Sequence, residues 1–270
     1  AVFGDADKVE YLGLNAAQRF PTLASGSIDI LSRNTTWTIS RDVNLMFEFA
    51  GVSYYDGQGF LVPASLGITS ARGLDGAFVC IASETTSELN LNDYFAENNM
   101  AYRPIYVEGN KDAKAKLFAG ECDVFTTDAS GLASARAGAE NPDDWVVLPE
   151  IISKEPLGPL VRQGDQEWED VVRWTLFAMI NAEEMGITSR NVDDMLAAQS
   201  KEVKRLLGVE GYMGPMLGLG MKFGYNIIKL VGNYGESFNK HIGPGTPLNL
   251  ERGLNNLWNN GGILYVPPFR

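Results

Sequence analysis

Along this chain, short apolar runs alternate with longer segments whose apolar residues recur every three or four positions. The apolar runs are typical of buried strands, and the longer segments are typical of helices that bury one face. The expected strands cover residues 8–14, 28–33, 57–63, 76–83, 102–108, 121–128, 145–151 and 157–165. The expected helices cover residues 15–26, 85–99, 110–120, 167–186, 191–197, 201–207, 222–232, 234–241 and 249–260. This alternation predicts an α/β fold with mostly parallel sheets.

Capping residues mark the ends of two of these expected helices. Asn15 opens the first helix and Gly26 closes it, which is the usual placement of an N-cap residue and a terminating glycine. Thr85 opens the helix at 85–99 and Glu88 follows three positions later, which is the spacing of a capping box. The free N–H groups of such a first turn suit an anionic group, although an ordinary helix cap explains the same residues.

One short pattern of apolar, small and acidic residues occurs twice, at an offset of 94 residues. It is LASGSIDILSRN from Leu23 to Asn34 and LFAGECDVFTTD from Leu117 to Asp128. Each copy combines the end of an expected helix, a glycine turn and an expected strand. The repeat predicts two similarly wound lobes, and chance reuse of a common helix–turn–strand connection is the alternative interpretation.

Polar residues end both copies of the repeat, at the position where open α/β sheets bind ligands. The offset pairs Asn34 with Asp128 and Thr36 with Ser130. Arg41 offers a planar guanidinium for a carboxylate, and Asp128 offers an acceptor for an ammonium group. Together with the N-terminus of the helix at 85–99, they predict a site for a zwitterion. An ion pair of Arg41 with a nearby acidic residue, or a loop-capping Asp128, is the alternative.

Composition and charge disfavour several classes of function. The chain has 270 residues, of which 45% are hydrophobic, and a net charge of −12 at pH 7. This charge disfavours nucleic acids and anionic membrane surfaces as partners. Two cysteines and one histidine are too few for a structural zinc site, and His241 lies in a Gly/Pro-rich stretch that argues against a Ser-His-Asp triad. We therefore expect no metal site. The sequence shows no membrane span and no signal peptide.

Several longer motifs make the sequence similar to a known protein family. They are LASGSIDILSRNTTWTISRD, FAGVSYYDGQGFLVP, TTSELNLNDYF, AGECDVFTTDASGL, NPDDWVVLPEIISKEPLGPLVRQGD and LNNLWNNGGILYVPP. With these motifs, which span nearly the whole chain, the sequence resembles the periplasmic amino-acid-binding proteins of ABC importers, solute-binding protein family 3. It is most similar to the subgroup that binds L-amino acids with broad specificity.

The resemblance implies a two-lobed α/β fold, the type II periplasmic-binding-protein fold. Residues 1–62 plus 154–270 would form lobe 1, including a C-terminal helical extension, and residues 63–153 would form lobe 2. In this family two crossing strands join the lobes, which close on the ligand. The implied function is to bind an L-amino acid in the periplasm and deliver it to a membrane permease, without catalysis and without a cofactor.

The resemblance also assigns residues to the carboxylate side of the ligand. Arg41 matches the family arginine that binds the α-carboxylate, and Thr36 matches a hydroxyl near the same group. Thr85 and Thr86 match the donors at the first helix of the second lobe. Glu84 departs from the family, which has glycine at this position. Its negative charge would weaken binding or favour basic ligands.

On the amine side, the resemblance assigns Asn34 and Asp128. Asp128 matches the aspartate that binds the α-ammonium, and Asn34 matches a residue that contacts the amine through its backbone or side chain. An enzyme of this fold would need an added general acid, for which Glu84 is the candidate that the sequence offers. We therefore expect a binding protein and not an enzyme.

The chain begins at a position that matches the end of the family's first helix. The family's first strand, a loop with a ligand-stacking aromatic residue and most of that helix have no counterpart here. We therefore expect lobe 1 to be N-terminally truncated, with an open sheet edge that favours a homodimer or a rearrangement. The alternative function is a truncated family member with weak or no ligand binding, acting as a dimeric or partner-binding module.

The two cysteines fall on expected strands that are neighbours in a doubly wound lobe. A disulfide between Cys80 and Cys122 is geometrically possible, and a periplasmic location favours oxidation. Two buried reduced thiols are the alternative.

Overall fold

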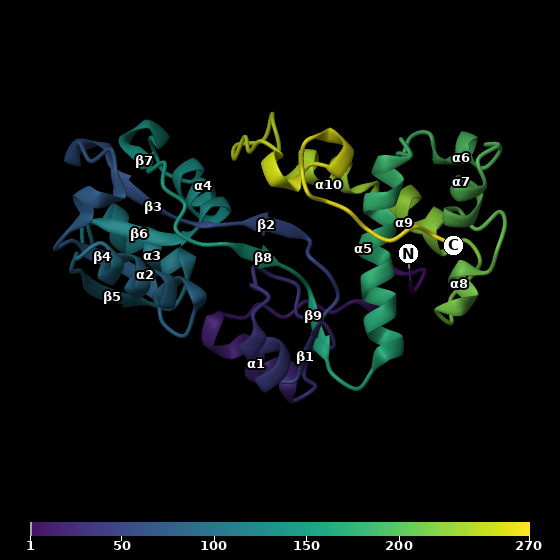
Figure 1. Ribbon diagram of the computed structural model, residues 1–270, viewed down its shortest axis with the longest axis horizontal. Coiled ribbons are helices and arrows are strands. Elements are labelled where there is room, and N and C mark those ends of the chain that lie inside the picture. The colour runs from purple at the N-terminus through teal and green to yellow at the C-terminus, as the bar shows by residue number, and fades with distance from the viewer. Residues whose placement is uncertain (1) are drawn as a thin grey trace. The chain divides into compact units, whose positions relative to one another are not determined.

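The computed structural model describes residues 2–270, which form two compact units. Unit 1 consists of the chain up to Leu12, Ser40–Ser53 and Pro159–Arg270, and unit 2 consists of Gly13–Ile39 and Tyr54–Gly158. Figure 1 traces the order of the elements along the chain. These units differ from the lobes expected from the sequence chiefly in residues 13–39, which belong to unit 2. The lobe boundaries expected from the sequence stay a prediction.

Unit 2 is built around a five-stranded mixed sheet with the strand order β5-β4-β6-β3-β7. Its strands are β3 Gln58–Pro63, β4 Phe78–Ala82, β5 Arg103–Val107, β6 Val124–Asp128 and β7 Trp145–Val147. Strand β4 runs parallel to β5 and β6, whereas β3 runs antiparallel to β6 and β7. The expectation of mostly parallel sheets is therefore wrong. Helical crossovers, which make neighbouring strands parallel, connect only β4, β5 and β6 in the part of the chain that the structure describes.

Helices pack on both faces of this sheet (Figure 1). Helix α2 Thr86–Glu97 connects β4 to β5, α3 Asn110–Phe118 connects β5 to β6, and α4 Ala129–Ala137 follows β6. Successive strand residues point to opposite faces, so Phe60 and Leu61 enter two separate apolar clusters. The first cluster includes side chains of α2, and the second includes side chains of α3 and α4. The sequence pattern predicts the two connecting helices but does not predict α4.

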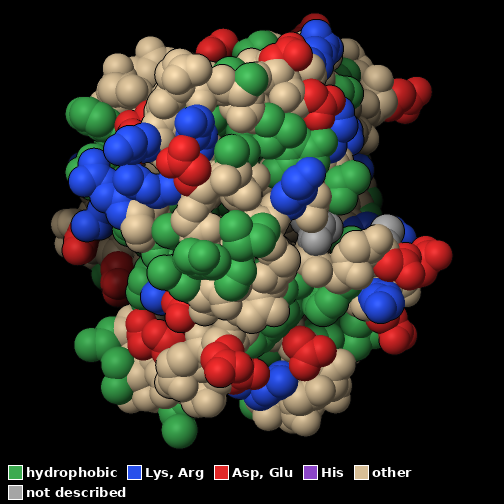
Figure 2. All heavy atoms as spheres, turned by 90° about the vertical axis from the view of Figure 1, so that its right-hand side faces the viewer, with side chains coloured by type: hydrophobic (Ala, Val, Ile, Leu, Met, Phe, Trp, Pro, Cys, Tyr) green, Lys and Arg blue, Asp and Glu red, His purple; other side chains and the backbone are tan. Residues whose placement is uncertain are grey.

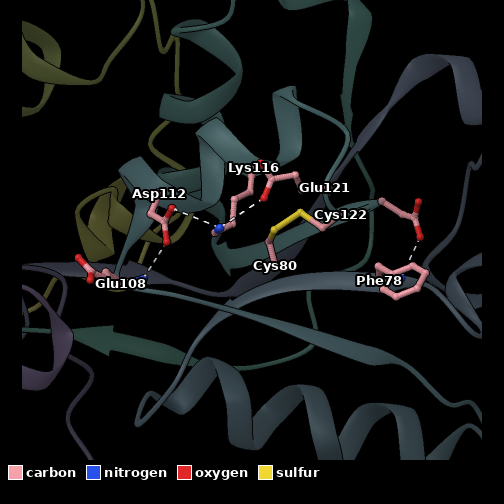
Figure 3. Close-up of a disulfide and its surroundings, with 8 residues drawn as sticks. Phe78, Cys80, Glu108, Asp112, Lys116, Glu121 and Cys122 are labelled. Atoms are coloured by element: carbon pink, nitrogen blue, oxygen red, sulfur yellow. Dashed lines mark hydrogen bonds and ion pairs between the residues drawn. A yellow bond between two sulfur atoms is a disulfide. The ribbon is translucent and has the colours of Figure 1, made fainter.

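A disulfide links two neighbouring strands of this sheet (Figure 3). Cys80 lies in β4 and Cys122 lies just before β6, and their Cα atoms are 5.8 Å apart. Nearby, the Lys116 ammonium pairs with Asp112 at 3.9 Å and with Glu121 at 3.4 Å. The turn between α3 and β6 is thus held by a covalent bond and by the ion pair of Lys116 with Glu121. Of the two alternatives that the sequence leaves open, the structure has the disulfide.

The first helix of unit 2 is well defined, but the segments on either side of it are not strands. Helix α1 spans Ala16–Ala24 and is capped by the side chain of Asn15, as the sequence predicts. Residues 28–33 form no strand, and neither do residues 8–14, where Tyr11 is 90% exposed. Both strand predictions are wrong, because neither apolar run is a strand of a sheet in the described part of the chain, although Leu31 forms a single β-bridge.

Unit 2 also contains a two-stranded antiparallel sheet. It pairs β2 Tyr54–Asp56 with β8 Glu155–Leu157. Thr36 forms an isolated bridge with Leu157. The polar residues that follow the first copy of the repeat therefore lie beside β8.

Unit 1 contains a small sheet and a cluster of helices. Strand β1 Phe47–Phe49 pairs antiparallel with β9 Leu160–Arg162. The helices are α5 Gln166–Glu184, α6 Val192–Met195, α7 Lys201–Leu206, α8 Met213–Met216, α9 Phe223–Val231 and α10 Tyr234–His241. Ala178 of α5, Leu206 of α7 and Ile227 of α9 belong to one apolar cluster, which forms the core of this unit.

The segment after α10 differs from the continuous helix predicted at 249–260. It contains two short 3₁₀ turns, Gly253–Asn255 and Trp258–Asn260. Asn249, Gly253 and Gly261 have positive φ angles. A right-handed helix does not accommodate this conformation, so the predicted helix is interrupted.

Figure 2 shows one face of the molecule, on which basic, acidic and hydrophobic side chains are interspersed. The 19-residue helix α5 has the same mixture along its length, QEWEDVVRWTLFAMINAEE. None of the helices within residues 2–270 combines the length and the apolar character that a membrane crossing needs.

Candidate functional site

Five of the six residues that the sequence assigns to ligand binding line one cavity in unit 2, with a volume of about 40 Å³. They are Asn34, Thr36, Thr85, Thr86 and Asp128. The wall also includes Ala16, Arg19, Arg33, Ala82, Ser87, Gly109, Asn110, Phe125, Thr126 and Thr127. The cavity therefore joins residues from both copies of the repeat. Their role in ligand binding stays a prediction.

The sixth residue, Arg41, belongs to unit 1. It lies in a short π-helix, Ser40–Asn44, and its side chain is buried. Its assignment to a ligand carboxylate stays a prediction.

Asp128 ends strand β6 and stands at the N-cap of α4, yet its side chain makes no capping hydrogen bond. The side chain is 4% exposed. Its Oδ2 atom accepts a hydrogen bond from Nδ2 of Asn34 at 2.7 Å. An aspartate at an N-cap ordinarily accepts a hydrogen bond from a backbone N–H of the first helical turn. The Asp128 carboxylate instead accepts its hydrogen bond from the side chain of Asn34.

Asp56, on strand β2, takes the capping role at α4. Its Oδ2 atom accepts hydrogen bonds from the Ser130 backbone N–H at 3.3 Å and from the Ser130 hydroxyl at 2.5 Å. Its Oδ1 atom accepts from the N–H of Gly57 at 2.8 Å. Because Asp56 satisfies the first turn of α4, Asp128 is released from that turn and pairs with Asn34.

The environment of Asp128 disfavours its charged form. The pKa of Asp128 is raised to about 7, chiefly by burial and in addition by the nearby carboxylates of Asp56 and Glu155, against the opposing effects of the hydrogen bond from Asn34 and the charge of Arg19. Burial also raises the pKa of Asp56. A cationic group next to Asp128 would offset this burial, which makes the position chemically suited to an ammonium group.

Two arginines fix the backbone and side chain of Asn34. The Nε and Nη2 atoms of Arg33 both donate to Oδ1 of Asn34, each at 3.2 Å, and Nη1 donates to the carbonyl of Leu14 at 2.7 Å. Burial lowers the pKa of Arg33, and the charge of Asp128 raises it. Nη1 of Arg19 donates to the Asn34 carbonyl at 3.2 Å. Arg19 and Arg33 are therefore functional candidates to which the sequence pattern assigned no role.

Glu155 is another functional candidate that the sequence pattern does not reveal. It is 2% exposed at the start of β8, and it accepts hydrogen bonds from the hydroxyl of Thr36 and, at 3.1 Å, from the hydroxyl of Thr86. Asn90 and Ser153 each donate to its Oε1 atom at 2.7 Å. Since a hydroxyl has one proton to donate, the two threonines offer acceptor positions to a ligand in this arrangement. Glu155 lies within the segment NPDDWVVLPEIISKEPLGPLVRQGD, but neither the sequence pattern nor the resemblance assigns it a role.

Thr85 caps helix α2, as the sequence predicts. Its hydroxyl accepts from the N–H of Glu88 at 3.3 Å and donates to the carbonyl of Ala82 at 2.8 Å. The Glu88 carboxylate reaches back to the N–H of Glu84 at 3.0 Å. Glu84 has a φ angle of 58°, in the left-handed region that favours glycine. The left-handed backbone conformation at this position therefore explains why the resemblance leads us to expect a glycine here.

Searches against known proteins found close relatives of the whole chain. The general L-amino acid-binding periplasmic protein AapJ of Rhizobium johnstonii is 56% identical over 272 residues, covering 100% of this chain and 80% of the relative. The glutamate/glutamine/aspartate/asparagine-binding protein BztA of Rhodobacter capsulatus is 52% identical over 271 residues, with the same coverage. No family model matches the chain.

A solved structure also matches the whole chain. It is an ABC transporter periplasmic binding protein from Brucella ovis with glutathione bound, and it superposes with a TM-score of 0.97. The sequences are 52% identical, and the match covers 100% of this chain and 85% of the other. The two-lobed periplasmic-binding-protein fold expected from the sequence is confirmed by this match.

Proposed function

Since this chain belongs to the periplasmic amino-acid-binding proteins of ABC transporters, we propose that it binds an L-amino acid through its α-ammonium and α-carboxylate groups. We further propose that it does so in the periplasm and passes the ligand to the membrane permease of an importer. The named relatives are binding proteins, which supports transport and not catalysis.

The observation that carries this proposal is the buried Asp128. Its carboxylate is held by Asn34 in a cavity whose wall includes the threonine pair at the N-terminus of α2. Burying an uncompensated carboxylate is costly, and a ligand ammonium would compensate the charge. The proposal therefore assigns Asp128 to the α-ammonium group.

For the carboxylate side, the proposal retains Arg41, Thr36, Thr85 and Thr86. A guanidinium and the free N–H groups of the first turn of α2 are donors that suit a carboxylate. The hydroxyls of Thr36 and Thr86 donate to Glu155. We infer that backbone N–H groups and Arg41 supply the donors, while the threonine side chains shape the site.

A second candidate ligand is glutathione, because the Brucella ovis structure holds it. The γ-glutamyl end of glutathione carries a free α-ammonium and a free α-carboxylate, so its head group matches that of an L-amino acid. The same site would then hold either ligand by the same end.

Isothermal titration calorimetry with a panel of L-amino acids, glutathione, one D-amino acid and the α-hydroxy acid analogue of the best ligand tests the proposal. We expect an L-amino acid or glutathione to bind, and the analogue without an ammonium group to bind at least tenfold more weakly. Asp128→Asn should weaken binding about 100-fold, because a charge-assisted contact is lost. Asp93→Asn, which changes an exposed aspartate of α2, is the matched control and should bind as wild type. Equal binding by Asp128→Asn would contradict the assignment.

The homodimer stays part of the proposal. It rests on the small sheet of unit 1, which has two strands among the described residues and presents edges of the kind that pair with other chains. Sedimentation velocity over a range of protein concentrations tests it. A monomer at every concentration would remove the homodimer from the proposal and leave the ligand assignment unchanged.

A further inference from the structure

The side-chain amide of Asn34 lies between a guanidinium and a carboxylate. Its Oδ1 atom accepts two hydrogen bonds from Arg33, each at 3.2 Å, and its Nδ2 atom donates to Asp128 at 2.7 Å. A guanidinium can only donate and an ionised carboxylate can only accept. The orientation of the amide is therefore decided by its two partners, since the flipped amide would face Arg33 with its NH₂ group.

Arg33 is itself tied to the backbone. Its Nη1 atom donates to the carbonyl of Leu14 at 2.7 Å, one residue before the N-cap of α1. A continuous series of hydrogen bonds therefore runs from Leu14 through Arg33 and Asn34 to Asp128. Each of these contacts lies within unit 2.

We propose that Arg33 is a positioning residue of the ligand site: it orients the Asn34 amide, which in turn holds the Asp128 carboxylate for the ligand ammonium. This inference rests on the proposed function for its biological meaning. The hydrogen-bond series joins groups of the protein alone, so it can be tested without a ligand.

The charges around Asp128 define what the loss of Arg33 would change. Asp56 from β2 and Glu155 from β8 face Asp128 with negative charge, and Arg19 from α1 faces it with positive charge, in addition to Arg33 and the Asn34 amide. Without Arg33, the amide is free to turn its oxygen toward Asp128. An acceptor at that distance favours a protonated carboxyl, so the pKa of Asp128 should rise.

A carboxylate titration by NMR of ¹³C-labelled aspartate in the ligand-free protein tests this step, with the Asp128 signal assigned through Asp128→Asn. In Arg33→Met we expect the titration midpoint of Asp128 to move up by about one pH unit from its position near 7. Arg33→Lys, which keeps the charge but loses the two-point contact, should move it in the same direction by less. Arg72→Met, which changes an exposed arginine of unit 2, is the control and should leave it unchanged. An unchanged midpoint in both Arg33 variants overturns the proposal, whatever the ligand.

A double-mutant cycle shows whether Arg33 acts through Asn34. Asn34→Leu removes the amide, so the titration midpoint of Asp128 should also rise in this variant. Adding Arg33→Met to Asn34→Leu should raise the Asp128 midpoint little further. Additive shifts would mean that Arg33 acts on Asp128 directly through its charge, and they would overturn the positioning role.

If L-glutamine, which has a neutral side chain, binds the wild type, its affinity at pH 7 should fall about fivefold in Arg33→Met and recover at higher pH. If no ligand in the panel binds, the proposed function fails while the NMR result still stands.

Discussion

The two copies of the repeated pattern, Leu23–Asn34 and Leu117–Asp128, share one turn but differ in the structure that the chain forms after the turn. In both copies the glycine has a positive φ angle, 77° at Gly26 and 74° at Gly120. Each glycine N–H donates to the carbonyl three positions earlier, at 3.1 and 3.0 Å, and the next residue donates to the carbonyl five positions earlier, at 3.2 and 2.9 Å. After the turn, the second copy enters β6 in the middle of the sheet, whereas the first forms no strand.

This difference separates local from non-local causes of structure. A helix, its cap and its terminating turn depend on neighbours within about five residues, so a repeated sequence builds them twice. A strand depends on partners that are distant in the sequence, and β6 has β4 and β3 on either side. The first copy nevertheless ends in the same cavity as the second, since Asn34 and Asp128, 94 residues apart, are hydrogen-bonded.

The largest expected effect concerns the disulfide, which joins Cys122 of the second copy to Cys80 and has no counterpart in the first copy. Replacing Cys80 and Cys122 by alanine should lower the free energy of unfolding by about 4 kcal/mol, because the bond closes a loop with a sequence separation of 42. Urea unfolding monitored by circular dichroism measures this change. As a control, a reductant should destabilise the wild type but not the double variant. A loss below about 1 kcal/mol would mean that the second copy is held mainly by its sheet neighbours.

The charged end of the second copy and the neutral end of the first should respond oppositely to substitution. The folded pKa of Asp128, about 7, lies above the unfolded value of about 3.9. The folded state therefore binds more protons between these values, and this group's contribution to stability falls as the pH rises from about 4 to 7. Asp128→Asn should thus raise the free energy of unfolding at pH 7 by about 1–4 kcal/mol and have little effect at pH 4.

Asn34→Ala should lower the free energy of unfolding by about 1 kcal/mol at pH 7, since it removes hydrogen bonds to both Arg33 and Asp128. Urea unfolding at several pH values tests both variants, with Asp93→Asn as the control that should show neither change. If Asp128→Asn destabilises the protein at pH 7, the raised pKa of Asp128 is wrong.

The shared turn can be tested with a matched pair of variants. Gly26→Ala and Gly120→Ala should each cost about 1–2 kcal/mol of stability, because alanine is strained at a positive φ angle. If the turns are equivalent, the two losses should agree within about 0.5 kcal/mol in urea unfolding. A large loss at one glycine alone would show that only that copy depends on its turn.

The smallest effect is expected at the start of the first copy's helix. Asn15 forms a reciprocal capping box with Gln18, whereas the helix of the second copy starts at Gly109 without a side-chain cap. Asn15→Ala should therefore lower stability by about 1 kcal/mol, while Asn15→Gly should lower it by only a few tenths. Thermal unfolding of the two variants side by side measures the difference. Equal losses of stability in the two variants would contradict this expectation.

Sequence reasoning worked where the cause of the structure was local. The cap at Asn15, the turn at Gly26 and the cap at Thr85 are confirmed, since each depends on a few neighbouring residues. The strands expected at 8–14 and 28–33 are wrong, because an apolar run cannot show whether another strand will pair with it. The mixed sheet was missed for the same reason.

The candidate site shows the same limit. Five predicted residues line the cavity. Asp128 ends a strand, and Thr85 and Thr86 open a helix, positions at which polar residues are informative. Asn34 and Thr36 follow a run that forms no strand, so they were identified from the repeat and the resemblance. Glu155 and Arg33 were assigned no role from the sequence, because their importance comes from contacts with Thr36, Thr86 and Asn34 that only the folded chain creates. The released N-cap at Asp128 also depends on a distant residue, Asp56.

The raised pKa of Asp128 has a consequence for the heat of binding. With a pKa of about 7, about half of the free protein molecules would carry a proton on this carboxyl near pH 7, and under the proposed assignment an ammonium ligand would bind the ionised half. Each binding event should therefore release about half a proton to the solvent. The observed binding enthalpy would then depend on the ionisation enthalpy of the buffer. The difference between the binding enthalpies measured in phosphate and in Tris would give the number of protons released.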